Sequence, residues 1–148
     1  MIMARTPFRI SFFGGGTDYP DWYLKNGGQV LSTTINKYCY ITVRKLPPFF
    51  EHQHRIVYSK IEAVKDIDQI DHPVVKAILK DQIKLNFGLE IHHDGDLPAR
   101  AGLGTSSSFA VGLTNALNAL LGKSSSKKFL AEYAINVEQN LLQENVGS

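Results

Sequence analysis

The segment from Pro98 to Ser108 has the composition of an anion-binding loop. It reads Pro-Ala-Arg-Ala-Gly-Leu-Gly-Thr-Ser-Ser-Ser and separates a short predicted strand from a strongly periodic predicted helix. Gly102 and Gly104 allow positive φ angles and let the backbone approach a ligand closely. The first amides of the following helix, with the positive end of its dipole, favour an anion over residues 105–107. The hydroxyls there can donate to phosphate oxygens, and one of them can bind a magnesium ion.

The ordinary alternative is an N-capped helix after a flexible turn, because Ser and Thr are preferred caps. Three consecutive hydroxyls exceed what one cap requires. The segment is not a dinucleotide fingerprint, since Ser107 stands where the third glycine would fall. Gly122-Lys123-Ser124 is not a Walker A ending either, since Leu117 occupies the position of the first glycine. The loop therefore predicts phosphate binding of another type.

A second segment near the N-terminus brings a cation and a carboxylate together. A predicted strand delivers Arg9, three glycines end the strand, and Thr17 and Asp18 follow. Glycines let the backbone come close to a ligand, and a carboxylate can accept hydrogen bonds from two neighbouring sugar hydroxyls. The alternative is a glycine-bearing turn with a surface aspartate.

These residues need a sheet and helices to position them. Period-2 alternation and β-branched or aromatic residues predict strands over residues 8–12, 30–34, 37–45, 54–59 and 89–92. Apolar stripes at helical spacing predict helices over residues 73–84, from about 109 to 122, and over 127–143. Strands first and helices later predict an α+β fold in which helices cover one face of a curved mixed sheet.

Glu138 is an unusual residue in the last predicted helix. It lies at helical spacing on a line of apolar residues with Ile135 and Leu142. That is an uncommon place for a carboxylate, and the alternative is a partly exposed glutamate paired with Lys or Arg.

The composition limits the class of protein. The chain has 148 residues, 43% hydrophobic and 20% charged, which predicts one ordinary globular domain. A formal net charge of +2 argues against nucleic acid as the main partner. A single cysteine, Cys39, and an N-terminus without the order of a signal peptide suit the cytoplasm. The stretch from Ala101 to Gly122 has no charge, but half of it is not apolar, so we expect no membrane span.

The two segments, in this order, resemble the GHMP kinases, the superfamily of galactokinase, homoserine kinase, mevalonate kinase and phosphomevalonate kinase. The matching residues are Arg-x-Ser-x-x-Gly-Gly-Gly-Thr-Asp from Arg9 and Pro-x-x-x-Gly-Leu-Gly-Thr-Ser-Ser from Pro98. The glycine-rich form is most similar to the D-glycero-D-manno-heptose 7-phosphate kinases, whereas galactokinases usually carry Glu-His at the positions of Gly15 and Gly16. The resemblance implies an N-terminal GHMP-kinase domain of the ribosomal protein S5 domain 2-like fold, spanning residues 1–148.

The resemblance also implies the reaction and the role of each matching residue. ATP would phosphorylate a sugar or sugar-phosphate hydroxyl, the anomeric one for a heptose 7-phosphate, with Mg²⁺ as cofactor. The loop for the ATP phosphates would consist of Gly102, Leu103, Gly104, Thr105, Ser106 and Ser107. Mg²⁺ would lie at Glu138 and at the hydroxyl of Thr105 or Ser106. Arg9 would be a catalytic and substrate-binding residue, and Gly16, Thr17 and Asp18 would bind the sugar.

One part of the family pattern falls beyond this sequence. In much of the family the catalytic aspartate follows shortly after a glycine equivalent to Gly147, and the sequence stops at Ser148. The family's second domain, which closes over the substrate, is not matched either. We therefore expect an N-terminal part of a longer kinase that alone retains weak MgATP affinity but does not turn over.

Other readings of the sequence stay open. The chain could be a sugar- or nucleotide-binding relative without catalysis, or an RNA- or protein-binding module of similar fold. The small net charge and the lack of a basic stripe interleaved with aromatic residues argue against RNA. His52, His54, His92 and His93 lack acidic or cysteine partners at metal-ligand spacing, so they predict no metal site. The sequence leaves a homodimer open.

Overall fold

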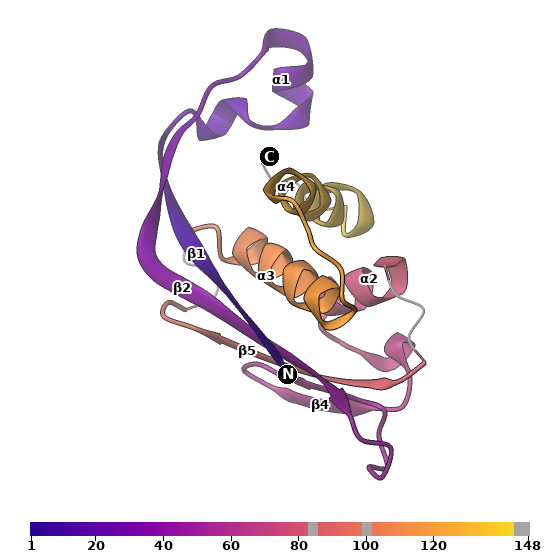
Figure 1. The fold of residues 1–148 in the computed structure, drawn as a ribbon. Helices are drawn as coiled ribbons and strands as arrows, with labels where there is room; N and C mark the ends of the chain where they lie inside the picture. Colours follow the sequence, from indigo (N-terminus) through magenta and orange to yellow (C-terminus); the bar gives the residue numbers. More distant parts are fainter. Residues whose placement is uncertain (83–85, 99–101, 144–148) are drawn as a thin grey trace.

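The structure is a computed structural model and describes residues 1–82, 86–98 and 102–143. Within these residues, one five-stranded sheet has the strand order β1-β2-β5-β3-β4. The β3–β5 pair is parallel, and the other three pairs are antiparallel. The strands are β1 (Ile2–Phe13), β2 (Leu31–Leu46), β3 (His54–Val57), β4 (Ile61–Val64) and β5 (Gly88–Gly95). β1 and β2 form a long ribbon that extends beyond the other strands (Figure 1).

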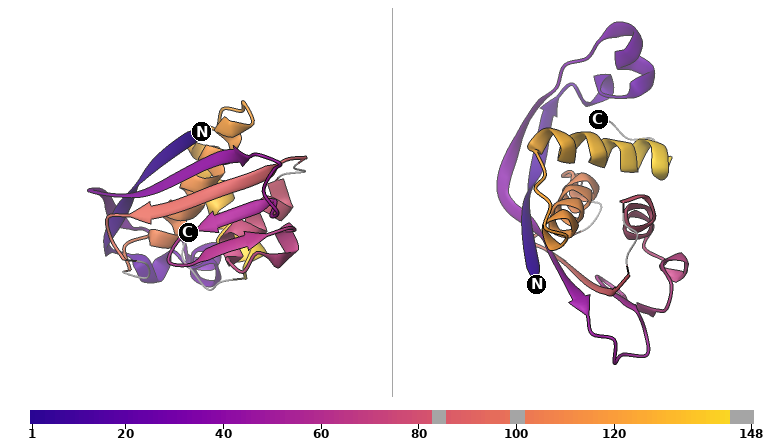
Figure 2. Two further views of the ribbon diagram at one scale, coloured as in Figure 1. Left: turned by 90° about the horizontal axis from the view of Figure 1, so that it is seen from below. Right: turned by 45° about the vertical axis from the view of Figure 1, so that its right-hand side comes forward.

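Three of the helices found in the described residues cover one side of this sheet. The helices are α1 (Pro20–Asn26), α2 (Pro73–Gln82), α3 (Thr105–Leu120) and α4 (Lys127–Asn136), with short turns η1 (Gly15–Thr17), η2 (Ile67–Gln69) and η3 (Val137–Leu141). α2, α3 and α4 lie on the same side of the sheet, and the left view of Figure 2 shows the strands in front of α3. The predicted α+β fold, with helices on one face of a curved mixed sheet, is confirmed.

The core lies between the sheet and these helices. Successive side chains of a strand point to opposite faces, and in the second half of β2 the alternate residues Cys39, Ile41 and Val43 are buried. Leu89 and Ile91 of β5 are buried on the same side. Burial also raises the pKa of the Cys39 thiol to about 12, so this side chain packs as a small neutral residue. The core residues without exposed surface are Cys39, Ile41, Val43, Val75, Ile78, Leu79, Leu89, Ile91, Ala110, Leu113 and Val137.

Several strands differ in extent from the sequence prediction. β1 begins at Ile2 rather than at residue 8, and it includes Pro7, which an edge strand tolerates. The two predicted strands over 30–34 and 37–45 are one continuous strand, β2. β3 ends at Val57, because the chain turns there into the short strand β4, which the sequence pattern did not predict.

The helices differ mainly at their ends. α2 ends at Gln82, and the last predicted helical residues, 83 and 84, lie outside the described residues. α4 is α-helical only to Asn136, after which η3 is a π-helical turn that contains Glu138. The short helix α1 was not predicted. Gly147, the family glycine of the sequence analysis, also lies outside the described residues.

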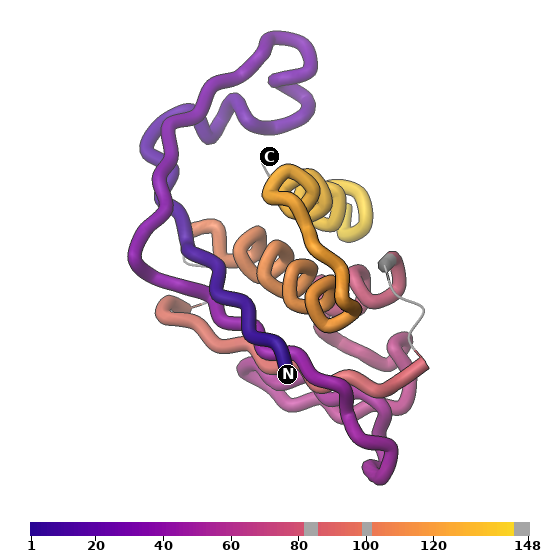
Figure 3. Tube along the Cα trace, viewed as in Figure 1, coloured from indigo at the N-terminus to yellow at the C-terminus, as the bar shows by residue number. Residues whose placement is uncertain are grey.

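Residues 14–30 form an excursion at the far end of the β1–β2 ribbon. The excursion carries η1 and α1, and in the view of Figure 3 it lies above α4. Arg9 lies on β1 between the core and this excursion. In the part of the chain that the structure describes, no helix is long and apolar enough to cross a membrane.

Candidate functional site

The N-terminus of α3 is open at the glycine-rich loop. Gly104 is the N-cap residue, with φ 68° and ψ 33°, and no side chain caps the helix. The first helical hydrogen bond runs from the Ser108 N–H to the Gly104 carbonyl, at 3.0 Å. The amides of residues 105–107 therefore have no intrahelical acceptor, and their N–H groups point outward from the N-terminus of the helix. The three hydroxyls do not serve as caps, so the helix end stays available to an anion.

β1 brings Arg9 against this loop. The Arg9 N–H donates to the Leu103 carbonyl at 3.1 Å, and Ser108 Oγ donates to the Pro7 carbonyl at 3.0 Å. The β1–β2 register shifts between Pro7 and Arg9, which changes the alternation of side chains along β1. A Cβ at Gly104 would lie 2.9 Å from Arg9 Cγ and 3.3 Å from its Nε. The Arg9 side chain thus packs on Gly104.

A buried carboxylate lies next to the first turn of α3. Ser107 Oγ donates to Glu138 Oε2 at 3.1 Å and is 3.4 Å from Oε1. Glu138 is only 4% exposed, and it takes part in no ion pair found among the described residues. Of the three hydroxyls of the loop, it is Ser107 that the structure brings to Glu138. The apolar line seen in the sequence is therefore only partly buried, with Glu138 buried and Ile135 and Leu142 half-buried.

A cavity of about 440 Å³ opens beside the other two hydroxyls. Its walls come from β1, the β3–β4 turn, the residues at the start of α2, β5 with the segment that follows it, and the first turns of α3. The ring of Phe109 lies between two histidines, stacked with His72 at 4.9 Å and edge-on to His93 at 4.9 Å. The lining residues are Phe8, Tyr58, Ser59, Asp71, His72, Pro73, Val74, His93, Leu97, Thr105, Ser106 and Phe109.

Both histidines of this cavity are held in the neutral form. Burial lowers the pKa of His72, and the nearby His93 lowers it further, while Glu62 opposes the shift. Burial likewise lowers the pKa of His93, against the charge of Asp94. The sequence analysis did not assign either histidine to a site, because only the tertiary packing brings them to the glycine-rich loop.

A second cavity of about 440 Å³ lies in the excursion between β1 and β2. Thr17 and Asp18 line it together with Ile135 of α4. Ile135 precedes Glu138 by three positions, across the junction between α4 and η3, so the residue that lines the cavity and the buried carboxylate are about one helical turn apart. The other lining residues are Tyr23, Gly28, Gln29 and Val30.

Thr17 closes the excursion. Its Oγ1 lies 2.8 Å from the Gly14 carbonyl and 3.0 Å from the Gln29 carbonyl, and it accepts from the Gln29 N–H at 3.1 Å. A Cβ on Gly14, whose φ is 91°, would lie 1.9 Å from the Gln29 oxygen. Gly16 faces open space, where a Cβ would meet nothing within 4 Å. The glycine run therefore makes a turn at Gly14 and leaves free backbone at Gly16.

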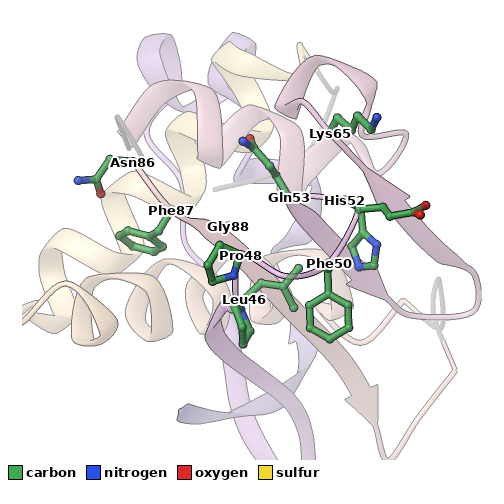
Figure 4. Close-up of a pocket in the computed structure, with 11 residues that line it drawn as sticks. Leu46, Pro48, Phe50, His52, Gln53, Lys65, Asn86, Phe87 and Gly88 are labelled. Atoms are coloured by element: carbon green, nitrogen blue, oxygen red, sulfur yellow. The ribbon is translucent and has the colours of Figure 1, made fainter.

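A further cavity lies away from these residues. It measures about 570 Å³ and is formed by the β2–β3 connection and the start of β5, with Phe50, His52 and Phe87 in its wall (Figure 4). None of the residues that the sequence singled out for phosphate, sugar or magnesium binding lines it. The candidate site is therefore the region around the N-terminus of α3.

Comparisons with known proteins agree with this geometry. Residues 72–148 match the family described as the GHMP kinases N terminal domain. This match covers more than half of the chain. The helix N-terminus that is open to an anion, beside a buried acid, defines a candidate phosphate-binding domain. The chain belongs to the GHMP kinase family.

Individual relatives are longer than this chain. The D-glycero-alpha-D-manno-heptose 7-phosphate kinase of Campylobacter jejuni is 28% identical over 146 residues, which cover 93% of this chain and 43% of that protein. A galactokinase of Pyrococcus furiosus is 32% identical over 126 residues, covering 80% and 34%. A crystal structure of a D-glycero-D-manno-heptose 1-phosphate kinase from Bacteroides thetaiotaomicron has the same fold, with a TM-score of 0.84 and 24% identity over 99% of this chain and 51% of that one. The chain thus spans about half or less of these proteins.

Proposed function

We propose that this chain carries the nucleotide and acceptor sites of a kinase that transfers the γ-phosphoryl group of ATP to a hydroxyl of a sugar or sugar phosphate. The contact between Ser107 Oγ and the buried Glu138 carboxylate, at the open N-terminus of α3, carries the proposal. Helix amides bind phosphates, and a hydroxyl beside a carboxylate supplies the oxygen ligands that Mg²⁺ takes together with nucleotide phosphates. The family match favours a kinase over other anion-binding proteins.

The glycine-rich loop would hold the phosphates of ATP. The amides of residues 105–107 have no intrahelical acceptor, and Gly102 and Gly104 have positive φ angles of 71° and 68°. Such a loop exposes backbone N–H groups without side chains in the way, so Leu103 contributes through its backbone alone.

The residues present fit a magnesium ion. The described residues contain no group of three or more His, Cys, Asp or Glu side chains that could hold a metal ion. Mg²⁺ usually takes one or two carboxylates and completes its shell with water and phosphate oxygens, which matches the single acid Glu138. Ser107 is the hydroxyl beside that acid, and Thr105 and Ser106 are the further candidates. When bound, the ion would neutralise charge on the phosphates.

The cavity beside Thr105 and Ser106 would take the base of ATP. It adjoins the phosphate loop, and its wall combines the rings of Phe109, His72 and His93. Flat rings of this kind stack with a planar base. Burial lowers the pKa of both histidines, which favours their neutral forms in this largely apolar site.

The acceptor would bind in the cavity of the excursion. Asp18 would accept hydrogen bonds from two sugar hydroxyls, the free backbone at Gly16 would lie against the ring, and Thr17 would hold the turn. Arg9, which packs on Gly104, would stabilise the oxygen that enters the phosphoryl group. The Campylobacter jejuni relative and the Gly-Gly-Gly-Thr-Asp segment favour the anomeric hydroxyl of D-glycero-D-manno-heptose 7-phosphate as the acceptor.

The reaction would proceed by positioning and charge stabilisation. The acceptor oxygen forms a bond to the γ-phosphorus, the bond from that phosphorus to the β–γ bridging oxygen breaks, and ADP leaves. The acceptor hydroxyl loses its proton to a base, for which we propose the aspartate that the family pattern places after residue 148. In the described residues, the amides of the α3 N-terminus and Arg9 would stabilise the charge on the transferring group.

The test uses the full-length protein with MgATP and a panel of sugars. We expect acceptor-dependent ADP release with D-glycero-D-manno-heptose 7-phosphate, and a phosphorus NMR signal for a new anomeric phosphate. ADP release with an unphosphorylated sugar alone would support the kinase and correct the acceptor. If the protein binds ATP and sugar but releases no ADP, it is a binding protein of this family without catalytic activity. If it does not bind ATP, the proposal is overturned.

A further inference from the structure

Glu62 is a second buried acid, and it lies outside the residues used above. It belongs to β4, opposite Ile56 of β3, and its side chain faces the helices with 5% exposure. No ion pair found among the described residues includes it, whereas the buried Glu90 on the other face is paired with Arg44 and Arg55. A buried carboxylate without a cation needs several hydrogen bonds to offset its lost hydration.

Glu62 obtains these bonds from the wall of the base cavity. Oε1 accepts from Tyr58 Oη at 2.8 Å and from the His72 N–H at 3.2 Å. Oε2 accepts from the Asp71 N–H at 2.6 Å. All three donors belong to residues that line the cavity beside Thr105 and Ser106, and Glu62 itself does not line it.

The same contacts fix the aromatic face of the cavity. Tyr58 meets the His72 ring edge-on, with centroids 4.8 Å apart, and His72 is stacked with Phe109 at 4.9 Å. The His72 Nδ1 accepts from the Val75 N–H at 3.4 Å, so the neutral ring carries its proton on Nε2. One carboxylate thus holds the tyrosine ring and the backbone of the histidine, and the histidine in turn contacts the phenylalanine.

We infer that Glu62 is a positioning residue for the base of the nucleotide: it preforms the Tyr58–His72–Phe109 wall on which the base stacks. This inference rests on the proposed function. Side chains that are already ordered bind the base without an entropy cost for immobilising them. Loss of the Glu62 hydrogen bonds should therefore weaken binding of the base more than binding of the phosphates. If Glu62 only stabilised the fold, its loss would weaken binding of the base and of the phosphates equally.

The test compares the full-length wild type with Glu62→Gln, which keeps the shape of the side chain and replaces one acceptor oxygen by a donor. We expect MgATP to bind about tenfold more weakly, a size typical of losing a hydrogen bond to a charged group. Magnesium tripolyphosphate, which has no base, should bind as to the wild type. The KM for ATP should rise, while kcat at saturating ATP and the KM for the acceptor stay unchanged.

Two phenylalanine variants make the test specific. Tyr58→Phe removes only the hydroxyl that donates to Glu62 and should also weaken MgATP without changing tripolyphosphate. Tyr133→Phe removes an equally long bond of 2.8 Å, from Tyr133 Oη to Asp81, outside the cavity, and should change neither ligand. If Glu62→Gln does not fold, Tyr58→Phe alone decides.

The outcomes separate this inference from the proposed function. If the wild type binds MgATP and both Glu62→Gln and Tyr58→Phe bind it equally well, the positioning role of Glu62 is overturned. The proposed kinase function is not affected by that result. Equal losses for MgATP and tripolyphosphate also overturn it, because they show general damage to the fold. Wild type that binds no MgATP overturns the proposed function together with the inference.

Discussion

At the scale of single residues, the site depends on close packing between Arg9 and Gly104. A side chain at Gly104 would meet the Arg9 stem at 2.9 Å, and the residue has a left-handed φ of 68°. Gly122, at the other end of α3, has nearly the same φ of 73° but open space around it. The two glycines therefore separate backbone strain from the contact with Arg9.

We predict that Gly122→Ala lowers the free energy of unfolding by about 1 kcal/mol, because it places an L-residue in the left-handed region. Gly104→Ala should lower it by at least as much, because its methyl group also displaces Arg9. Only Gly104→Ala should reduce kcat/KM, by about a hundredfold, since it displaces Arg9 and the loop. Urea unfolding and steady-state kinetics of the full-length variants measure both effects. Equal kcat/KM for the two variants would contradict the role given to this contact.

At the scale of elements, the hydroxyl of Thr17 joins the two ends of the excursion over residues 14–30. Thr17 Oγ1 lies within 2.8–3.1 Å of backbone atoms of Gly14 and Gln29. Thr17→Val should loosen the acceptor cavity and raise the KM for the sugar about tenfold, while the KM for ATP stays the same. Thr33→Val on β2, whose hydroxyl contacts only a neighbouring carbonyl at 3.3 Å among the bonds described, is the matched control. A parallel rise in both KM values would argue against a separate acceptor cavity.

Elements also show how far the sequence predicts this structure. The periodic stripes predicted the sheet, α2, α3 and the face of α4, because these elements bury long apolar patterns. α1 and β4 were missed, since each is too short to display a period. The glycine-rich loop and Glu138 were recognised as unusual, but the π-helical turn that carries Glu138 was not.

The partner of Glu138 is a tertiary effect. Ser107 lies 31 positions earlier in the chain, on another helix, so no local pattern relates the two residues. The same holds for Glu62 and the His72–Phe109–His93 contacts, which bring together β4, the residue before α2, α3 and β5. The motif residues could be predicted from the sequence. The residues that contact them could be identified only from the three-dimensional structure.

At the scale of the whole molecule, three histidines make stability depend on pH. Burial is the largest cause that lowers the pKa of His54, His72 and His93 below the usual value of 6.5. The unfolded chain therefore binds more protons than the folded chain once the pH falls below about 6.5. The charged or titratable groups that act on these rings are Asp66 at His54, His93 and Glu62 at His72, and Asp94 at His93.

We predict that the free energy of unfolding decreases as the pH is lowered from about 7.5 to about 5.5. Replacing His93 by Asn should reduce this slope, because the variant has one fewer buried ring to protonate. Urea unfolding at both pH values gives the difference. Glu90 acts in a separate window: burial opposes, but hydrogen bonds from His92 and Arg44 lower its pKa, so its contribution is lost only below the usual glutamate value of 4.5. A stability that does not change between the two pH values would contradict the prediction.

The most direct test of the account is the magnesium-dependent turnover of ATP by the full-length protein with Glu138→Gln. Glu132→Gln is the matched control, since Glu132 lies on the exposed side of α4, 64% exposed and paired with Lys128. We predict that Glu138→Gln loses at least about a hundredfold in kcat and needs more Mg²⁺, as expected when a group that stabilises transferring charge is removed. Glu132→Gln should behave as the wild type. A Glu138→Gln enzyme with unchanged kcat and magnesium dependence would contradict the claim that the Ser107–Glu138 pair binds the metal of MgATP.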